Sequence, residues 1–243
     1  MAQRPLAILL PPSEGKAEGG RSPAWNPGSG RFGRQLGSHR RSVAEALAAA
    51  DGGDARLLGV KGVHLERARA VNRFLVGSPT LTAFERYTGV VWDHLDFETM
   101  SARTRARAED SVVVVSGLLG LVGIIDRIPE YKLKMGAALP HLGKLSTWWR
   151  PKLSAVLNSW LLADGGRVVI DLLPQEHRAA WEVDPELGRN HIVVNFVNRS
   201  GRAVGHDAKA AKGLLARHLL ESKGAAAGAL ASWRHPQFSL ELL

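Results

Sequence analysis

The chain has 243 residues and a mass of 26.2 kDa, which suits one large domain or two small ones and is long enough to bury a sizeable core. It contains no cysteine, so disulfide bonds and thiolate metal sites are excluded, and its apolar runs fall far short of the roughly 20 residues that span a bilayer. With 32 basic and 23 acidic residues, the net charge of +9 fits a polyanionic partner such as nucleic acid or, equally, a generic basic surface.

The first half of the chain alternates apolar runs with glycine-rich stretches. Leu6–Leu10 predicts a strand, either at the edge or in the centre of a sheet. The apolar stretch there is too brief for a signal peptide, so we expect a cytosolic protein. Residues 17–41, rich in Gly, Ser, Pro and Arg, predict a long loop or a flap over a site. Ser42 is expected to cap a helix that ends at Asp51–Gly53, and another helix is expected to begin near His64.

The second half continues the mixture of strands and helices. Val112–Val115 is a β-branched run of the length expected for a buried strand. The other predicted elements are a polar helix in 96–110, a helix after Ser146, strands in 167–173 and 191–197, and a helix after Asp207. This mixture, without internal repeats, predicts an α/β or α+β fold.

Two glycine-containing stretches have the wrong spacing for nucleotide loops. Residues 10–20, LPPSEGKAEGG, lack the first glycine of a phosphate-binding loop, and Ala17 stands where its metal-binding hydroxyl should be. Gly117, Gly120 and Gly123 follow a strand, but a dinucleotide fingerprint needs its first two glycines closer together. We interpret this second stretch as a tight strand-to-helix turn.

Residues 55–76 are the candidate for contact with DNA. Gly59-Val60-Lys61-Gly62 continues an apolar-Gly-apolar-x-Gly pattern, which is typical of the turn in a helix-hairpin-helix. Backbone N–H groups at the start of the second helix would point at a DNA phosphate. Such a contact positions the DNA backbone and does not read the base sequence. The expected contacts are Gly59, Lys61, Gly62, Arg67, Arg69 and Arg73. The alternative is an ordinary helix–loop–helix that uses glycine for its turn.

Lysines and possible metal ligands give weaker signals. Lys132 and Lys134 alternate with apolar residues, a strand-like pattern that projects both onto one face. That face is either solvated or a cationic wall beside Ser116 and the loop of residues 13–16. The candidates for iron ligands have unconvincing spacing; they are His94, Asp96, Glu176, His177 and His206. We therefore expect no metal and no other cofactor.

Seven separated blocks of the chain carry a family resemblance. They are LLPPSEGK (9–16), RYTGVVWD (86–93), SGLLG (116–120), DRIPEYKLKMG (126–136), the Trp148-Trp149 helix, VVIDLLPQE (168–176) and KAAKGLLARHLLE (209–221). In this order they resemble the peroxide stress resistance protein YaaA family over nearly the whole chain. The resemblance implies a cytosolic protein of peroxide stress, with one α/β domain over residues 1–243. That domain would have a central mixed β-sheet, surrounding helices and a helix-hairpin-helix that binds duplex DNA.

The resemblance also implies a shared polar cleft. Its expected catalytic residues are Lys16, Ser116, Lys134 and Lys212. Its expected further lining is Ser13, Glu14, Tyr87, Asp126, Tyr131, Asp171, Glu176 and Arg217. Converging lysines would lower one another's pKa, and a neutral lysine could act as a base or a Schiff-base nucleophile. The alternative is that Lys16 pairs with an acid such as Glu14 and only closes its loop.

The chain departs from the family pattern at several positions. Leu119 stands where an aromatic residue is expected, and Gly123-Ile124 stands where Arg-Pro is expected. Asp171 replaces a common Asn, and residues 175–177 are Gln-Glu-His in place of a segment like Asp-Glu-Tyr. Without the arginine, the site would lose a group that binds phosphate through two hydrogen bonds, and without the aromatic residue it would lose a ring on which a ligand can stack. These departures indicate a divergent member with a changed ligand.

Three hypotheses about the function follow from this sequence. The first is a stress protein that binds duplex or branched DNA without sequence preference. The second is an enzyme that uses the lysine-rich cleft on a base or sugar in DNA, or on a small anionic metabolite. The third, iron handling, rests on the weak ligand set, and no membrane partner is expected. The segment Trp233–Phe238 resembles an engineered streptavidin-binding peptide and is left out of these hypotheses.

Overall fold

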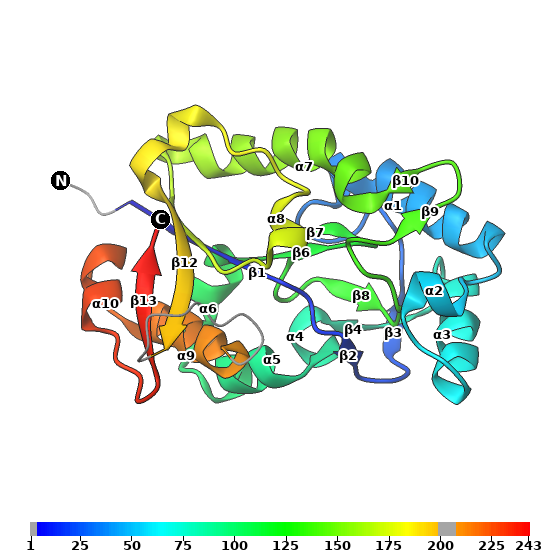
Figure 1. The fold of residues 1–243 in the computed structure, drawn as a ribbon, viewed down its shortest axis with the longest axis horizontal. Helices are drawn as coiled ribbons and strands as arrows, with labels where there is room; N and C mark the ends of the chain where they lie inside the picture. Colours follow the sequence, from blue (N-terminus) through cyan, green and yellow to red (C-terminus); the bar gives the residue numbers. More distant parts are fainter. Residues whose placement is uncertain (1–3, 199–207) are drawn as a thin grey trace.

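The central sheet has six strands in the order β13-β12-β11-β1-β6-β7 in the computed structural model, which describes residues 4–198 and 208–243 (Figure 1). The strands are β1 (Leu6–Leu10), β6 (Val112–Ser116), β7 (Gly120–Gly123), β11 (Val168–Asp171), β12 (His191–Asn198) and β13 (Phe238–Leu242). The four inner strands are parallel to one another, whereas β7 and β13 pair antiparallel at the two edges. The mixed α/β class and the central mixed sheet are therefore confirmed.

Strands β1 and β6 lie inside the sheet because both of their faces are covered. Every residue of LAILL and of VVVVS is buried, and such unbroken apolar runs are typical of parallel strands covered on both sides. Figure 1 shows α7 (Leu145–Leu162) above the sheet and α5 (Val90–Leu95), α6 (Ala102–Ser111) and α9 (Lys209–Glu221) grouped below it. Met100 and Met135 belong to this core and are 3% and 0% exposed.

Smaller elements surround the central sheet. The short sheets are β2 (Gly15–Lys16) with β5 (Tyr87–Thr88), β3 (Arg21–Ala24) with β4 (Pro79–Thr82) and β8 (Arg127–Pro129), and β9 (Ala138–Leu139) with β10 (Gly143–Lys144). The other helices are α1 (Gly33–Ala49), α2 (Ala55–Leu58), α3 (Val63–Arg73), α4 (Ala83–Arg86), α8 (Gln175–Arg178) and α10 (Ala226–Ser232). Turns of 3₁₀ helix occur at Phe97–Thr99, Ala163–Gly165 and Pro185–Asn190. Within the described ranges, no helix is long and apolar enough to cross a membrane.

The predicted loop at 17–41 is wrong, because strand β3 and the first half of α1 occupy much of it. The buried face of α1 includes Gly33, which lies so close to Gly28 that an added Cβ would be 2.1 Å from the Gly28 carbonyl oxygen. The same face includes Arg40, whose guanidinium is buried. Glycine and arginine thus serve as packing residues here, which their composition did not indicate.

Other local predictions also need correction. Ser42 lies within α1, and α7 begins at Leu145 with Lys144 at the N-cap position, so neither Ser42 nor Ser146 caps a helix. The glycines after β6 lead into the antiparallel strand β7 and not into a helix. The polar helix of 96–110 is divided into a 3₁₀ turn and α6, and residues 132–134 form no strand. Asp207, the expected cap of α9, lies outside the described residues.

The segment Trp233–Phe238 is an integral part of the fold. The ring of Trp233 is buried and contacts Phe196 of β12 edge to face, with ring centroids 5.8 Å apart. Phe238 begins β13, which pairs with β12 along five residues, from Asn198 opposite Phe238 to Val194 opposite Leu242. Despite its resemblance to an engineered peptide, this segment therefore packs on the central sheet and leads into its edge strand, β13.

Candidate functional site

The candidate site lies at the carboxyl ends of the parallel strands. The order of the sheet places β1 between β6 and β11. After β1 the chain thus adds β6 on one side of this strand and later β11 on its other side. Open α/β sheets bind their ligands at such a switch point, beyond the carboxyl ends of the strands. Two cavities of 670 and 70 Å³ lie there, and they share the walls formed by Pro12, Ser13, Glu14, Glu176 and His177.

Lys16 lies on β2, opposite Tyr87 of β5. Its Nζ donates a hydrogen bond to the carbonyl oxygen of Ser13 at 2.9 Å and lies 4.2 Å from the centre of the Tyr131 ring. Burial, and then the charge of Lys132, lowers the pKa of Lys16 from 10.5 to about 7. Among the described residues no acid lies within ion-pair distance of this amine. Lys16 is therefore about half neutral at pH 7.

A chain of buried hydroxyl groups adjoins Lys16. The Ser116 and Tyr131 hydroxyls lie 2.7 Å apart, and those of Tyr131 and Tyr87 lie 2.9 Å apart. Burial raises the pKa of Tyr131 to about 12 and that of Tyr87 well above 10, so both phenols stay protonated at neutral pH. Ser116 is fully buried and lines neither cavity. These three residues support the wall around Lys16 and do not face a substrate.

His177 faces both cavities from α8. Its Nδ1 lies 2.8 Å from the carbonyl oxygen of Val115, and because a carbonyl only accepts, Nδ1 carries the proton. Burial lowers the pKa of His177, so the ring is neutral at pH 7 and Nε2 keeps a free lone pair. Sequence reasoning placed His177 only among iron ligands. The structure places it beside the lysines, where it can accept a proton or a hydrogen bond.

Helix α9 supplies two further lysines to the larger cavity, Lys209 and Lys212. The Nζ of Lys212 donates to the carbonyl oxygen of Leu172 at 2.8 Å. Burial, and then the charge of Arg178, lowers the pKa of Lys212 to about 8. Helix α9 reaches this position because Gly213 packs on α5: an added Cβ would lie 2.2 Å from the carbonyl oxygen of Val91.

The loop after β8 forms the opposite wall of the smaller cavity. Lys132 donates to the carbonyl oxygen of Glu14 at 3.2 Å, and Lys134 lies next to the turn between α2 and α3. The two cavities are thus lined by several lysines and two glutamates; these are Lys16, Lys132, Lys134, Lys209, Lys212, Glu14 and Glu176. The excess of cationic groups favours an anionic ligand.

Two carboxylates of the expected polar cleft have other surroundings. Asp126 accepts hydrogen bonds from the backbone amides of Arg31 and Gly123, at 2.9 and 2.8 Å, and holds the turn after β7. Asp171 is fully buried at the end of β11 and forms an ion pair with Arg178 at 2.6 Å. Neither carboxylate lines the two cavities.

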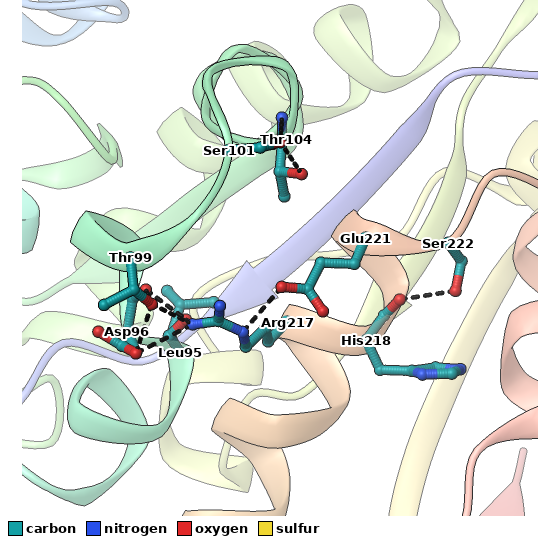
Figure 2. A network of polar contacts seen from close by, with 9 residues as sticks. All are labelled: Leu95, Asp96, Thr99, Ser101, Thr104, Arg217, His218, Glu221 and Ser222. Atoms are coloured by element: carbon teal, nitrogen blue, oxygen red, sulfur yellow. Dashed lines mark hydrogen bonds and ion pairs between the residues drawn. The ribbon is translucent and has the colours of Figure 1, made fainter.

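Arg217 belongs to a separate polar network, which Figure 2 shows. It forms ion pairs with Asp96 at 3.1 Å and with Glu221 at 2.9 Å, and it donates to the Thr99 hydroxyl at 2.9 Å. These contacts attach α9 to the end of α5 and to the 3₁₀ turn at Phe97–Thr99. The role of Arg217 in the described structure is therefore to position α9.

The arginines of α3 are already engaged in ion pairs. Arg67 binds both carboxylate oxygens of Glu130, at 2.9 and 3.1 Å, and Glu18 at 3.0 Å. Arg69 and Arg73 both pair with Asp51. Lys61, in contrast, is exposed at the tip of the turn between α2 and α3.

The departures at Leu119 and Ile124 do not open the cavities. Leu119 is buried in the turn between β6 and β7, and its carbonyl oxygen accepts a hydrogen bond from Arg40 at 2.8 Å. Ile124 is fully buried as well. The residue that sequence reasoning missed is Trp92, which lines the larger cavity and lies in the block RYTGVVWD. Its position in that block was the available signal.

Metal binding finds no support in the part of the chain that the structure describes. No group of three or more His, Asp or Glu residues is placed there to hold an ion. His94 is engaged with the carbonyl oxygen of Val90 at 2.8 Å, and Asp96 pairs with Arg217. His206, another of the iron candidates, lies outside the described residues.

Comparisons with known proteins agree with the family resemblance. A family model described as peroxide stress protein YaaA matches residues 6–242. A UPF0246 protein of Streptomyces coelicolor is 34% identical over 226 residues, which cover 92% of this chain and 86% of that protein. A UPF0246 protein of Francisella tularensis subsp. novicida is 30% identical over 141 residues, 56% of this chain and 55% of that protein. The family match begins in β1 and ends in β13, so it includes the whole central sheet.

Proposed function

This chain belongs to the peroxide stress protein YaaA family, and on that premise we propose that it binds the backbone of duplex or branched DNA without reading its sequence. The contact is made by the turn between α2 and α3. The net charge of +9 supports such a partner, because phosphate neutralisation releases counterions whatever the base sequence.

The geometry of the turn supports this assignment. Gly59 ends α2 at a φ of 67°, and Gly62 begins α3 at a φ of 56°, both in the left-handed region that favours glycine. The first amides of α3 have no partner within the helix, so a phosphate placed there would accept their hydrogen bonds. Lys61 and Gly62 are exposed at this point.

The observation that carries the proposal is the contact between the turn and the lysine cavity. A Cβ added to Gly59 would lie 3.2 Å from the Nζ of Lys134, and Lys134 lines the smaller cavity with Lys16 and Lys132. A DNA strand whose phosphates follow the turn would pass beside this cavity. We assign the main contact to Lys61, because Arg67, which pairs with two glutamates, would exchange existing ion pairs for new ones.

Lys61→Glu is expected to weaken the binding of a fluorescent duplex about tenfold near 0.1 M salt, because a phosphate contact is replaced by repulsion. The slope of log K against log salt concentration should fall by about 1. Fluorescence anisotropy in solution measures both the affinity and the slope.

Lys223→Glu is the matched control for this experiment. It makes the same change of charge at an exposed position between α9 and α10, at the opposite end of the molecule from α2 and α3 in Figure 1. If Lys61→Glu and Lys223→Glu bind DNA equally well, with equal salt slopes, the turn is not the DNA contact.

Amine chemistry at Lys16 is a second candidate function. The observation that favours it is a lysine with a pKa of about 7, next to a cavity and beside the neutral ring of His177. A neutral amine can attack an aldehyde, such as the sugar of an abasic site, and form an imine with loss of water. Borohydride would then reduce the imine to a stable amine. Trapping of abasic DNA on wild type, but not on Lys16→Ala, tests this candidate.

A further inference from the structure

A third cavity, of 480 Å³, lies at the amino end of β1, whereas the candidate site lies at the carboxyl ends of the strands. Its wall is formed by the start of β1, one face of α6 and the end of α9. Figure 2 shows part of this wall, with Ser101 and Thr104 on α6 and Glu221 and Ser222 at the end of α9. The residues that line this cavity line neither of the two cavities described above. A ligand here would therefore be independent of the proposed function.

The acidic residues of this wall are already neutralised by arginines from outside it. The wall contains two acids, Asp110 and Glu221. Asp110 forms an ion pair with Arg167 at 2.9 Å, and Glu221 forms one with Arg217 at 2.9 Å. Neither Arg167 nor Arg217 lines the cavity. The two carboxylates are thus not available to balance the basic residues of the wall.

The basic residues of the wall have no acid within ion-pair distance in the described part of the chain. They are Arg4, Arg103, Arg107 and Lys223. Arg103 and Arg107 lie one turn apart on the same face of α6, where like charges repel each other. Burial, and then the charge of Arg103, lowers the pKa of Arg107. Arg107 donates to the carbonyl oxygens of Leu220 and Ser222, which are neutral and leave its charge uncompensated.

The composition of the wall indicates the class of the ligand. The described wall contains no aromatic ring on which a base could stack, and its two leucines, Leu6 and Leu220, are buried. It does contain hydroxyl groups that can donate to an anion, at Ser101, Thr104 and Ser222. Its basic residues come from three separate segments, which suits several charged oxygens better than a single phosphate. These features favour a compact, highly charged anion over a nucleotide.

We propose that this cavity binds a compact anion that carries two phosphoryl groups, held by Arg103 and Arg107 on α6 and by Arg4 and Lys223 from the other segments. Its volume lies within the range of about 300 to 1,000 Å³ that small-molecule sites occupy. The bound anion also removes the repulsion between Arg103 and Arg107, so it should stabilise the folded protein.

Inorganic pyrophosphate is the probe for this proposal, added without metal and at constant ionic strength, so that general screening does not change. Pyrophosphate should raise the melting temperature of the wild-type protein, and orthophosphate should raise it less. In isothermal titration calorimetry, Arg103→Gln should bind pyrophosphate about tenfold more weakly, because one charge-assisted contact is lost. Without the anion, Arg103→Gln should melt no lower than wild type, because the variant removes a like-charge contact.

Arg105→Gln is the matched control. It makes the same change of charge on the same helix, but Arg105 does not line the cavity, so this variant should bind pyrophosphate as wild type does. A sugar bisphosphate that binds more tightly than pyrophosphate would identify an organic ligand of the same class.

Three results would overturn the proposal. The first is an equal affinity of Arg103→Gln and Arg105→Gln for pyrophosphate. The second is binding that is lost in Lys212→Met but kept in Arg103→Gln, which would place the anion in the larger lysine-lined cavity. The third is the absence of any binding to wild type at about 10 mM pyrophosphate. None of these results bears on DNA binding at Lys61, so the two proposals can fail separately.

Discussion

Lys16 is expected to be the fastest lysine of the chain to react with formaldehyde and cyanoborohydride at pH 7, by roughly tenfold. An amine with a pKa of about 7 is about half neutral at this pH, whereas an ordinary lysine is less than about 0.1% neutral. The sign of the pH dependence follows. Lys16 is charged and unreactive below its pKa, so its rate should rise from about pH 6 to pH 8 and then level off, while ordinary amines continue to gain reactivity toward pH 10. Peptide mass spectrometry measures each rate.

Lys132→Met is the informative variant for this experiment. Burial is the main cause of the low pKa of Lys16, and it remains in the variant, but the second cause, the charge of Lys132, is removed. The midpoint of the Lys16 rate should therefore move to higher pH. A Lys16 rate that climbs with the exposed lysines up to pH 10 would show that the amine is charged at neutral pH. Schiff-base chemistry at this position would then lose its physical basis.

Arg40→Met is expected to lower the free energy of unfolding by about 4 kcal/mol. The guanidinium is 3% exposed and donates to the carbonyl oxygens of Leu119, Leu121, Pro27 and Ser29, at 2.7 to 3.1 Å. Burial lowers its pKa to about 10, so the group remains charged at neutral pH. Methionine fills similar volume but leaves these carbonyl groups buried without a donor.

Urea denaturation measures this loss as a lower midpoint with an unchanged slope. Arg41→Met is the matched control, because Arg41 is the exposed neighbour on the same helix. Its free energy of unfolding should change by less than about 0.5 kcal/mol. Arg40→Lys should fall between the two, since its three donors cannot reach every carbonyl. Equal midpoints for Arg40→Met and Arg41→Met would contradict the structural role of Arg40.

The sequence was informative where one physical signal dominates. The apolar run at 6–10 predicts a strand and that at 112–115 a buried strand, because a strand covered on both faces needs an unbroken apolar run. Strand ends in turn indicate where polar residues gather, so the expectation that Lys16 lies near Lys134 and Lys212 followed from local patterns and the family resemblance. The cavities contain these lysines in their walls.

The failures come from residues whose role depends on distant partners. The first half of α1 was missed because Gly33 and Arg40 are typical of loops. Gly33 packs on the nearby Gly28, and Arg40 donates to Leu119 in the β6–β7 turn, far along the chain. Arg217 belongs to a family block, yet its partner Asp96 is known only from the fold. Trp92 carries no periodic signal, since its place in the wall of the larger cavity depends on how α5 packs in the fold.

The placement of sulfur in this fold has a consequence for a protein of the peroxide stress family. Hydrogen peroxide attacks thiolates and accessible thioethers, and oxidation of a buried methionine disrupts a core. This chain has no cysteine, and of its three methionines one is the first residue while Met100 and Met135 are 3% and 0% exposed. Within the described residues, the oxidant thus meets no exposed sulfur. Peroxide can therefore oxidise the described core only after that core opens, and the absence of cysteine rules out thiol oxidation altogether.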